Sequence, residues 1–167
     1  MNEAETRAEH IDPALKAAGW GVVEGSRVRR EFPITPGRIE GLGRRGKPLT
    51  ADYVLEYRNR KLAVVEAKAW DEALTEGVGQ GKNYAGKLAI RFAYATNGQG
   101  IYAIDMQTGK EGEIAAYPPP DQLWQMTDDY LPWLRERAGL EADSSLEEIF
   151  FAVARPEGEV TESEAKQ

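Results

Sequence analysis

Residues 51–68 read ADYVLEYRNRKLAVVEAK, a stretch in which two mostly apolar runs flank the polar triplet 58–60. Valine, leucine and tyrosine in short runs bounded by turn-forming residues predict two β-strands, over residues 52–57 and 61–68. Strands this close in sequence pair as an antiparallel hairpin. The first expectation is therefore a β-hairpin whose second strand ends in the sequence Glu-Ala-Lys.

The register of this hairpin decides whether its acidic side chains meet. Glu66 and Lys68 stand two residues apart, so they project from the same face of the second strand. A three-residue turn over 58–60 would place Asp52 directly opposite Glu66 and on that same face. A two-residue turn would oppose Asp52 to Ala67 and turn the two carboxylates to opposite faces. We therefore predict the three-residue turn as the condition for a shared site.

Two carboxylates that face each other across strands repel, and a cation between them removes this conflict. Asp52, Glu66 and the main-chain carbonyl of Ala67 would offer hard oxygen ligands suited to Mg²⁺, with Mn²⁺ as a substitute. Lys68 would orient a metal-bound water and neutralise developing negative charge. Together these groups suit hydrolysis of a phosphodiester. The alternative is a solvent-facing Glu66–Lys68 pair, with Asp52 simply beginning a strand.

A predicted helix over residues 72–87 follows the hairpin. Gln80 and Tyr84 are four residues apart and so share one face of it. An amide and a phenol can hold a phosphate oxygen or a base edge without adding charge. These two residues therefore extend the candidate catalytic site, unless Tyr84 only packs on the sheet and Gln80 is exposed.

Composition excludes several other classes of site. The 167 residues include no cysteine, which excludes zinc fingers, iron–sulfur clusters and thiol nucleophiles. The single histidine, His10, argues against a histidine-based zinc site or a Ser-His-Asp triad. The longest apolar run, residues 149–154, is too short to cross a membrane. The acidic N-terminus lacks the features of a secretory signal. We expect a cytoplasmic protein without a membrane partner.

Charge is distributed unevenly along the chain, whose net charge is −7. Residues 27–47 carry a net charge of +5, and residues 136–167 carry −6. A local basic segment can contact phosphates even in an acidic protein. We therefore predict that Arg44, Arg45 and Lys47 contact the phosphates of a polyanion such as DNA; the alternative is an ordinary solvated loop rich in glycine and proline.

The remaining elements are predicted from periodicity and turn residues. Further helices are expected over residues 3–18 and 121–138. Further strands are expected near residues 21–23, 27–32, 90–96, 101–105 and 113–117.

Five motifs in this order resemble the N-terminal nuclease domain of the motor (R) subunit of type I restriction enzymes. The resemblance covers about residues 3–120. The motifs are Glu5-Thr6-Arg7 with Ile11-Asp12-Pro13 and Gly19-Trp20, then Ala51-Asp52-Tyr53-Val54-Leu55, Val65-Glu66-Ala67-Lys68, Gln80-x-x-x-Tyr84-Ala85 and Ala95-Thr96-Asn97-Gly98. The resemblance implies an α/β fold with a restriction-endonuclease-like (PD-(D/E)xK) core, a mixed β-sheet flanked by helices. It also implies Mg²⁺-dependent cleavage of double-stranded DNA.

The resemblance assigns roles residue by residue. The family's metal-binding and catalytic positions fall on Asp52, Glu66 and Lys68. Its glutamine–tyrosine motif falls on Gln80 and Tyr84. Ala51 replaces the proline of the family's nominal signature, a departure that leaves the metal chemistry intact. Glu5 falls where related nucleases carry a metal-facing helix carboxylate, and Glu9, one turn further along, is the alternative.

In that family the nuclease domain precedes an ATP-driven motor, for which this sequence has no phosphate-binding motif. We expect a nuclease domain over residues 1–138 and an acidic segment over 139–167 leading toward that motor. ATP would act only in the motor, and separate methylation and specificity subunits would be partners. Two alternatives stay open: a stand-alone repair or junction-resolving nuclease of the same fold, and a catalytically silent DNA-binding or docking module.

Overall fold

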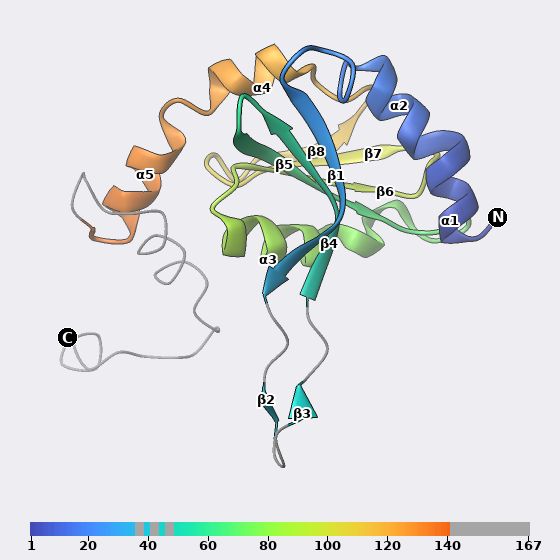
Figure 1. The fold of residues 1–167 in the computed structure, drawn as a ribbon, viewed down its shortest axis with the longest axis horizontal. Helices are drawn as coiled ribbons and strands as arrows, with labels where there is room; N and C mark the ends of the chain where they lie inside the picture. Colours follow the sequence, from blue (N-terminus) through green and yellow to red (C-terminus); the bar gives the residue numbers. More distant parts are fainter. Residues whose placement is uncertain (36–38, 41–43, 46–48, 141–167) are drawn as a thin grey trace.

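A computed structural model describes residues 1–35, 39–40, 44–45 and 49–140 of the chain. Its centre is a mixed six-stranded sheet with helices on both sides (Figure 1). In their order across the sheet, the strands are β1 (Ser26–Thr35), β4 (Leu49–Tyr57), β5 (Arg60–Ala67), β6 (Phe92–Thr96), β7 (Ile101–Asp105) and β8 (Glu111–Ile114). Strands β5 and β6 are parallel, and all other neighbours are antiparallel. The predicted mixed sheet flanked by helices is confirmed.

Helices complete the two layers around this sheet. Parallel β5 and β6 need a crossover, which is supplied by the 3-10 turn η2 (Leu74–Gly77) and helix α3 (Val78–Leu88). The predicted first helix is a continuous helical run made of α1 (Glu3–Thr6), the π-helical turn η1 (Arg7–Ile11) and α2 (Asp12–Ala17). No helix in the described part of the chain is long and apolar enough to span a membrane.

Each face of the sheet buries its own apolar core, as the alternation of side chains along a strand requires. On one face, Ile11 and Leu15 of the N-terminal helical run pack in a cluster with Tyr53, Leu55 and Val65. On the other face, residues of α3 pack in a second cluster, which contains Val54, Val64, Tyr84, Ala85 and Ala93. The central hairpin is therefore covered on both sides.

The predicted three-residue turn is wrong. Tyr57 pairs with Arg60, so the turn contains only Arg58 and Asn59, both in the left-handed region at φ 52° and 63°. Two successive residues of this kind suit the twist of a two-residue hairpin turn. Leu62 then lies opposite no residue of its own, because Glu56 pairs with Lys61 while Leu55 pairs with Ala63. This β-bulge adds back the residue that the shorter turn omits.

Three other expectations need correction. Residues 21–23 form turns rather than a strand, since Gly19 and Gly21 take positive φ values of 104° and 79°. The predicted helix 121–138 is two helices, α4 (Pro120–Met126) and α5 (Tyr130–Arg137). The Thr127 hydroxyl donates to the Trp124 carbonyl at the end of α4. The last strand covers Glu111–Ile114 rather than residues 113–117.

The segment between β1 and β4 is rich in glycine and proline, a composition typical of a loop. It contains the short strands β2 (Ile39–Glu40) and β3 (Arg44–Arg45), which pair with each other and not with the main sheet. The predicted DNA-binding residues Arg44 and Arg45 therefore lie on β3, although the placement of their side chains is not described. Lys47 lies outside the described residues.

Candidate functional site

The two predicted carboxylates meet where the pairing of β4 with β5 stops. The last regular pair is Tyr53 with Val65. Beyond it, the backbone N–H of Asp52 donates to Glu66 Oε1 at 3.2 Å, and the N–H of Ala67 donates to Asp52 Oδ2 at 2.7 Å. Each carboxylate thus replaces a backbone acceptor of the neighbouring strand, and the structure brings Asp52 and Glu66 together despite the different turn.

A cleft of about 350 Å³ opens at this end of the hairpin. Its lining includes every residue for which a catalytic role was predicted. The lining residues are Glu3, Leu49, Thr50, Asp52, Glu66, Ala67, Lys68, Gln80 and Tyr84. Side chains from β4, β5 and α3 therefore converge on one polar space.

Hydrogen bonds connect the end of β5 to α3. Lys68 Nζ donates to Gln80 Oε1 at 3.3 Å, and Gln80 Nε2 donates to the Tyr84 hydroxyl at 3.3 Å. Gly77, just before α3, allows the backbone to lie close to Glu66 of β5, because a Cβ atom at Gly77 would lie 3.3 Å from the Cβ of Glu66. The Lys68 ammonium is thus held by the helix that the glutamine–tyrosine spacing singled out.

The Glu66 carboxyl lies beside a second carboxyl, that of Asp52, and the Glu66 side chain is almost entirely buried. Burial, and then the charge of Asp52, raises the pKa of the Glu66 carboxyl well above its usual range. Burial, and then the charge of Glu66, also raises the pKa of the Tyr84 hydroxyl. A cation placed between the two carboxylates would offset the repulsion that adds to the effect of burial in both pKa shifts.

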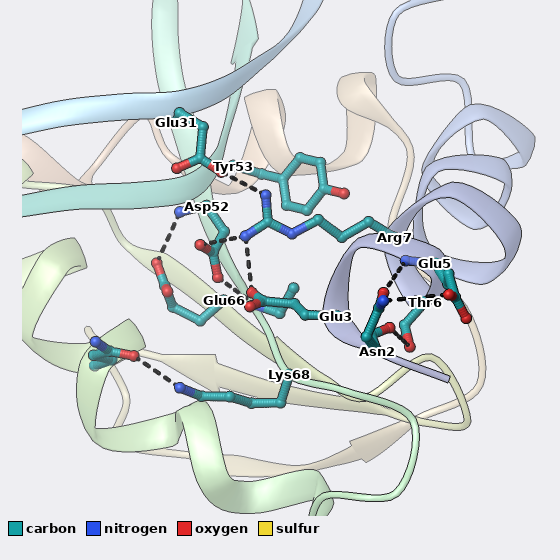
Figure 2. A network of polar contacts seen from close by, with 12 residues as sticks. Asn2, Glu3, Glu5, Thr6, Arg7, Glu31, Asp52, Tyr53, Glu66 and Lys68 are labelled. Atoms are coloured by element: carbon teal, nitrogen blue, oxygen red, sulfur yellow. Dashed lines mark hydrogen bonds and ion pairs between the residues drawn. The ribbon is translucent and has the colours of Figure 1, made fainter.

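Arg7, which the sequence reasoning did not select, binds directly to this site (Figure 2). Its Nη2 donates to Asp52 Oδ1 at 2.6 Å and to Glu3 Oε1 at 2.9 Å, while Nη1 donates to Glu31 Oε1 at 2.6 Å. The guanidinium carbon also lies 5.5 Å from the centre of the Tyr53 ring. The four-residue spacing of Glu3 and Arg7 was the available signal, because it places both on one face of the helix.

The residue before Arg7 attaches the same helix to the other strand of the hairpin. Thr6 is fully buried, and its hydroxyl accepts a hydrogen bond from the N–H of Trp70 at 3.1 Å. Trp70 lies in the segment that follows Lys68 at the end of β5. Thr6 and Arg7 together therefore fix the N-terminal helix against both strands that carry the carboxylates.

The structure does not bring Glu5 or its alternative, Glu9, to the cleft. Glu5 is exposed and caps the helix start with Asn2, whose Oδ1 accepts from the Glu5 N–H at 2.8 Å. Glu3 lines the cleft instead. The reason is helical geometry, because two residues correspond to about 200° of rotation and so point Glu3 and Glu5 in nearly opposite directions.

The donors in the cleft fit a hard divalent cation that keeps water or phosphate ligands. Within the described residues, no group of three or more Asp, Glu, His or Cys side chains is arranged to hold a metal ion. Asp52 and Glu66 supply two carboxylates, and the Ala67 carbonyl faces β4 together with its N–H. Mg²⁺ is usually bound through one or two carboxylates plus substrate phosphates. The donor set therefore suits Mg²⁺ or Mn²⁺ better than a metal that needs a complete protein cage.

Comparisons with known proteins agree with this architecture. No family model matches the chain. The chain is 33% identical over 136 residues to the type I restriction enzyme EcoAI endonuclease subunit of Escherichia coli, covering 75% of this chain and 16% of that protein. A solved fragment described as an HsdR subunit of a type I restriction enzyme from Vibrio vulnificus YJ016 is similar, with a TM-score of 0.69 and 33% identity. That similarity covers 84% of this chain and 27% of the fragment, and it confirms the restriction-endonuclease-like α/β core.

Proposed function

This chain is homologous to part of the endonuclease subunit of type I restriction enzymes, and from that premise we propose that it is the nuclease domain of such a subunit. The proposed reaction is Mg²⁺-dependent endonucleolytic cleavage of double-stranded DNA. The observation that carries the proposal is the convergence of Asp52, Glu66 and Lys68 in one cleft. Carboxylates and a lysine in this arrangement suit hydrolysis of a phosphodiester.

Three groups would hold the metal ion: the carboxylates of Asp52 and Glu66 and the main-chain carbonyl of Ala67. Mg²⁺, or Mn²⁺ in its place, would polarise a phosphoryl oxygen and lower the pKa of a bound water. Glu3 takes the place proposed earlier for Glu5, because it is the helix carboxylate that lines the cleft. It would supply a further acceptor for metal-bound water.

Lys68 would act on the oxygens where charge develops. Its ammonium would donate hydrogen bonds to the attacking water and to a non-bridging phosphate oxygen. As the new bond to phosphorus forms and the bond to the sugar oxygen breaks, the attacking water would release a proton to solvent and the leaving sugar oxygen would take one up. Gln80 accepts a hydrogen bond from Lys68 and donates one to Tyr84, so α3 orients the ammonium. Lys68 is thus proposed as the cationic group that orients the attacking water and neutralises developing negative charge, and Gln80 with Tyr84 as the residues that position it.

The activity of a complete enzyme is a wider proposal, since the chain spans 16% of its Escherichia coli relative. We propose that an ATP-driven motor lies in the parent protein outside this sequence and that residues 139–167 lead toward it. Separate methylation and specificity subunits would direct the cleavage. Substitution of Asp52 in the complete enzyme should then stop DNA cleavage while leaving ATP hydrolysis unchanged.

Cleavage of supercoiled plasmid by the 167-residue chain tests the proposal. We expect nicking with Mg²⁺ or Mn²⁺ that stops on addition of EDTA. Asp52→Asn, Glu66→Gln and Lys68→Ala should each lower the rate by about 100-fold or more, the scale of losing one electrostatic contact to the transition state. Glu113→Gln is the matched control, because it neutralises an exposed carboxylate on β8.

Other outcomes identify the alternatives. Cleavage that persists in EDTA would overturn the metal-dependent mechanism. Activity of the chain alone on branched or damaged DNA, without ATP or partner subunits, would indicate a stand-alone nuclease. Absence of cleavage in both the isolated chain and the complete subunit would indicate a silent DNA-binding or docking module.

A further inference from the structure

The Arg7 guanidinium joins three carboxylates from three separate elements (Figure 2). Its partners are Asp52 at 2.6 Å, Glu31 at 2.6 Å and Glu3 at 2.9 Å. Within the described residues, no other base forms an ion pair with Asp52 or Glu66, since the Lys68 ammonium donates to Gln80. Among the described residues, the base in direct ionic contact with a proposed metal ligand is therefore Arg7, through Asp52.

The backbone on both sides of this contact departs from regular geometry. Arg7 begins a π-helical turn within the N-terminal helix. Glu31 has a φ of 51°, which strand residues other than glycine rarely adopt, and it lies in β1 across from Asp52. In the described part of the chain, Arg7 Nε is buried without a hydrogen-bond partner. Departures of this kind concentrate at functional sites.

We propose that Arg7 is a resident counter-ion of the cleft, with which a divalent cation has to compete for Asp52, so that Arg7 limits the affinity of the cleft for that cation. The inference rests on the proposed function, because it takes Asp52 and Glu66 as the ligands of the cation. It goes beyond that function by assigning control of metal binding to a residue of the N-terminal helix.

Removing Arg7 should change Mn²⁺ affinity mainly through the loss of its charge, and not through movement of Asp52. The guanidinium lies against Asp52 Oδ1, where its charge repels a divalent cation bound to the same carboxylate, and this repulsion rises as the separation falls. Without Arg7, the Glu3 carboxylate that lines the cleft would also be released from its ion pair. Asp52 would stay in place, because its Oδ2 still accepts the Ala67 N–H.

Titration of the 167-residue chain with Mn²⁺ alone, by calorimetry, tests the inference. Arg7→Gln should bind Mn²⁺ about tenfold more tightly than the wild type, given the strength of charge interactions at contact distance. Arg30→Gln is the matched control. The Arg30 guanidinium lies 5.8 Å from the centre of the same Tyr53 ring but pairs with Asp12. It should change the Mn²⁺ affinity by less than about threefold, because an exposed charge that does not contact Asp52 is screened.

A second variant predicts the opposite direction. Glu31→Gln removes a carboxylate that shares Arg7, so Arg7 should hold Asp52 more firmly and Mn²⁺ should bind several-fold more weakly. Local misfolding can only weaken metal binding, so tighter binding by Arg7→Gln cannot arise from it. If Arg7→Gln does not fold by circular dichroism, weaker Mn²⁺ binding by a Glu31→Gln variant that keeps the wild-type circular dichroism and stability still supports the inference, and unchanged binding overturns it.

Mn²⁺ binding by the variants distinguishes an error in the role of Arg7 from an error in the proposed metal site. Mn²⁺ binding that disappears in Asp52→Asn but is unchanged or weaker in Arg7→Gln would overturn the role of Arg7 alone. Mn²⁺ binding that survives in both Asp52→Asn and Glu66→Gln would overturn the proposed metal site, and the inference with it. No uptake of Mn²⁺ by either the wild type or Arg7→Gln would also overturn both.

Discussion

Two carboxylates shielded from solvent differ in what lies beside them. Asp105 receives two hydrogen bonds from the Arg91 guanidinium, at 2.9 Å and 2.8 Å, which lower its pKa although burial acts in the opposite direction. Glu66 instead has Asp52 as its neighbour, so burial and a like charge both raise its pKa. A buried acid that faces another acid is costly for the fold, and such sites are commonly functional.

The Asp105–Arg91 pair makes a prediction about acid stability. Because the folded-state pKa of Asp105 is lowered, its contribution to stability is present above the ordinary pKa of an aspartate and is lost as pH falls through the lowered value. Asp105→Asn should lower the free energy of unfolding at pH 7 by about 1–2 kcal/mol, allowing for solvent screening. Urea denaturation at pH 7 and pH 3 measures this.

The pH dependence provides the check on this assignment. The difference in stability between wild type and Asp105→Asn should shrink as the pH falls below the ordinary pKa of an aspartate, because the wild-type carboxyl then takes up its proton. A difference that stays constant over that range would mean that shape, rather than charge, is what the variant loses.

At the scale of elements, the β4–β5 hairpin brings Asp52 beside Glu66 through two compensating differences from the predicted pairing. The turn has two residues instead of three, and Leu62 forms a bulge that restores the missing residue. Leu62 belongs to the core cluster on the face of the N-terminal helix, where it is almost fully buried. The bulge thus adds a core side chain without moving Asp52 away from Glu66.

Deletion of Asn59 tests this view of the hairpin. The shortened chain can keep a two-residue turn, Arg58-Arg60, if the bulge is absorbed and Glu56 pairs with Leu62. Mn²⁺ affinity should then stay within about threefold of the wild type, because the pairing at the site is unchanged. Stability should fall by about 2–4 kcal/mol, since Leu62 would turn out of the core.

Leu62→Ala is the control for this deletion, because it loses the same side chain and keeps the turn. It should lose a similar amount of stability, measured by urea denaturation, and retain Mn²⁺ binding. A deletion variant that folds but no longer binds Mn²⁺ would show that the register has slipped and that the bulge cannot be absorbed.

For the molecule as a whole, charge is separated along the chain rather than balanced locally. The segment 27–47 is basic although the net charge of the chain is −7. Such a segment can attract the phosphate backbone while acidic regions stay away from it. The proposed DNA contacts of Arg44, Arg45 and Lys47 depend on this distribution of charge, because the positive charges of the segment together attract the phosphates.

Salt dependence measures that contribution. Neutralising one of these three residues, for example in Arg45→Gln, should weaken the binding of DNA whatever the DNA sequence. It should also reduce the slope of log affinity against log salt concentration by about one unit, as expected for the loss of one phosphate contact. Fluorescence anisotropy with a labelled duplex at several salt concentrations would show it, and an unchanged slope would mean that the substituted residue does not contact a DNA phosphate.

Local periodicity was enough to determine the parts of the candidate site that lie on single elements. Glu66 and Lys68 share a face because side chains alternate along a strand, and Gln80 and Tyr84 share a face because a helix repeats every 3.6 residues. The helical run at the N-terminus and the central hairpin were likewise evident from residue patterns. These features depend on neighbours in sequence, so the sequence alone contains them.

Only the tertiary structure decided how those elements meet. Whether Glu3, Glu5 or Glu9 reaches the cleft depends on how the N-terminal helix is rotated against the sheet. The ion pair of Arg7 with Asp52 joins residues 45 positions apart. The turn and bulge depend on which packing buries Leu62 while keeping Tyr53 opposite Val65. Each of these outcomes balances burial and charge between distant segments, and no local pattern encodes that balance.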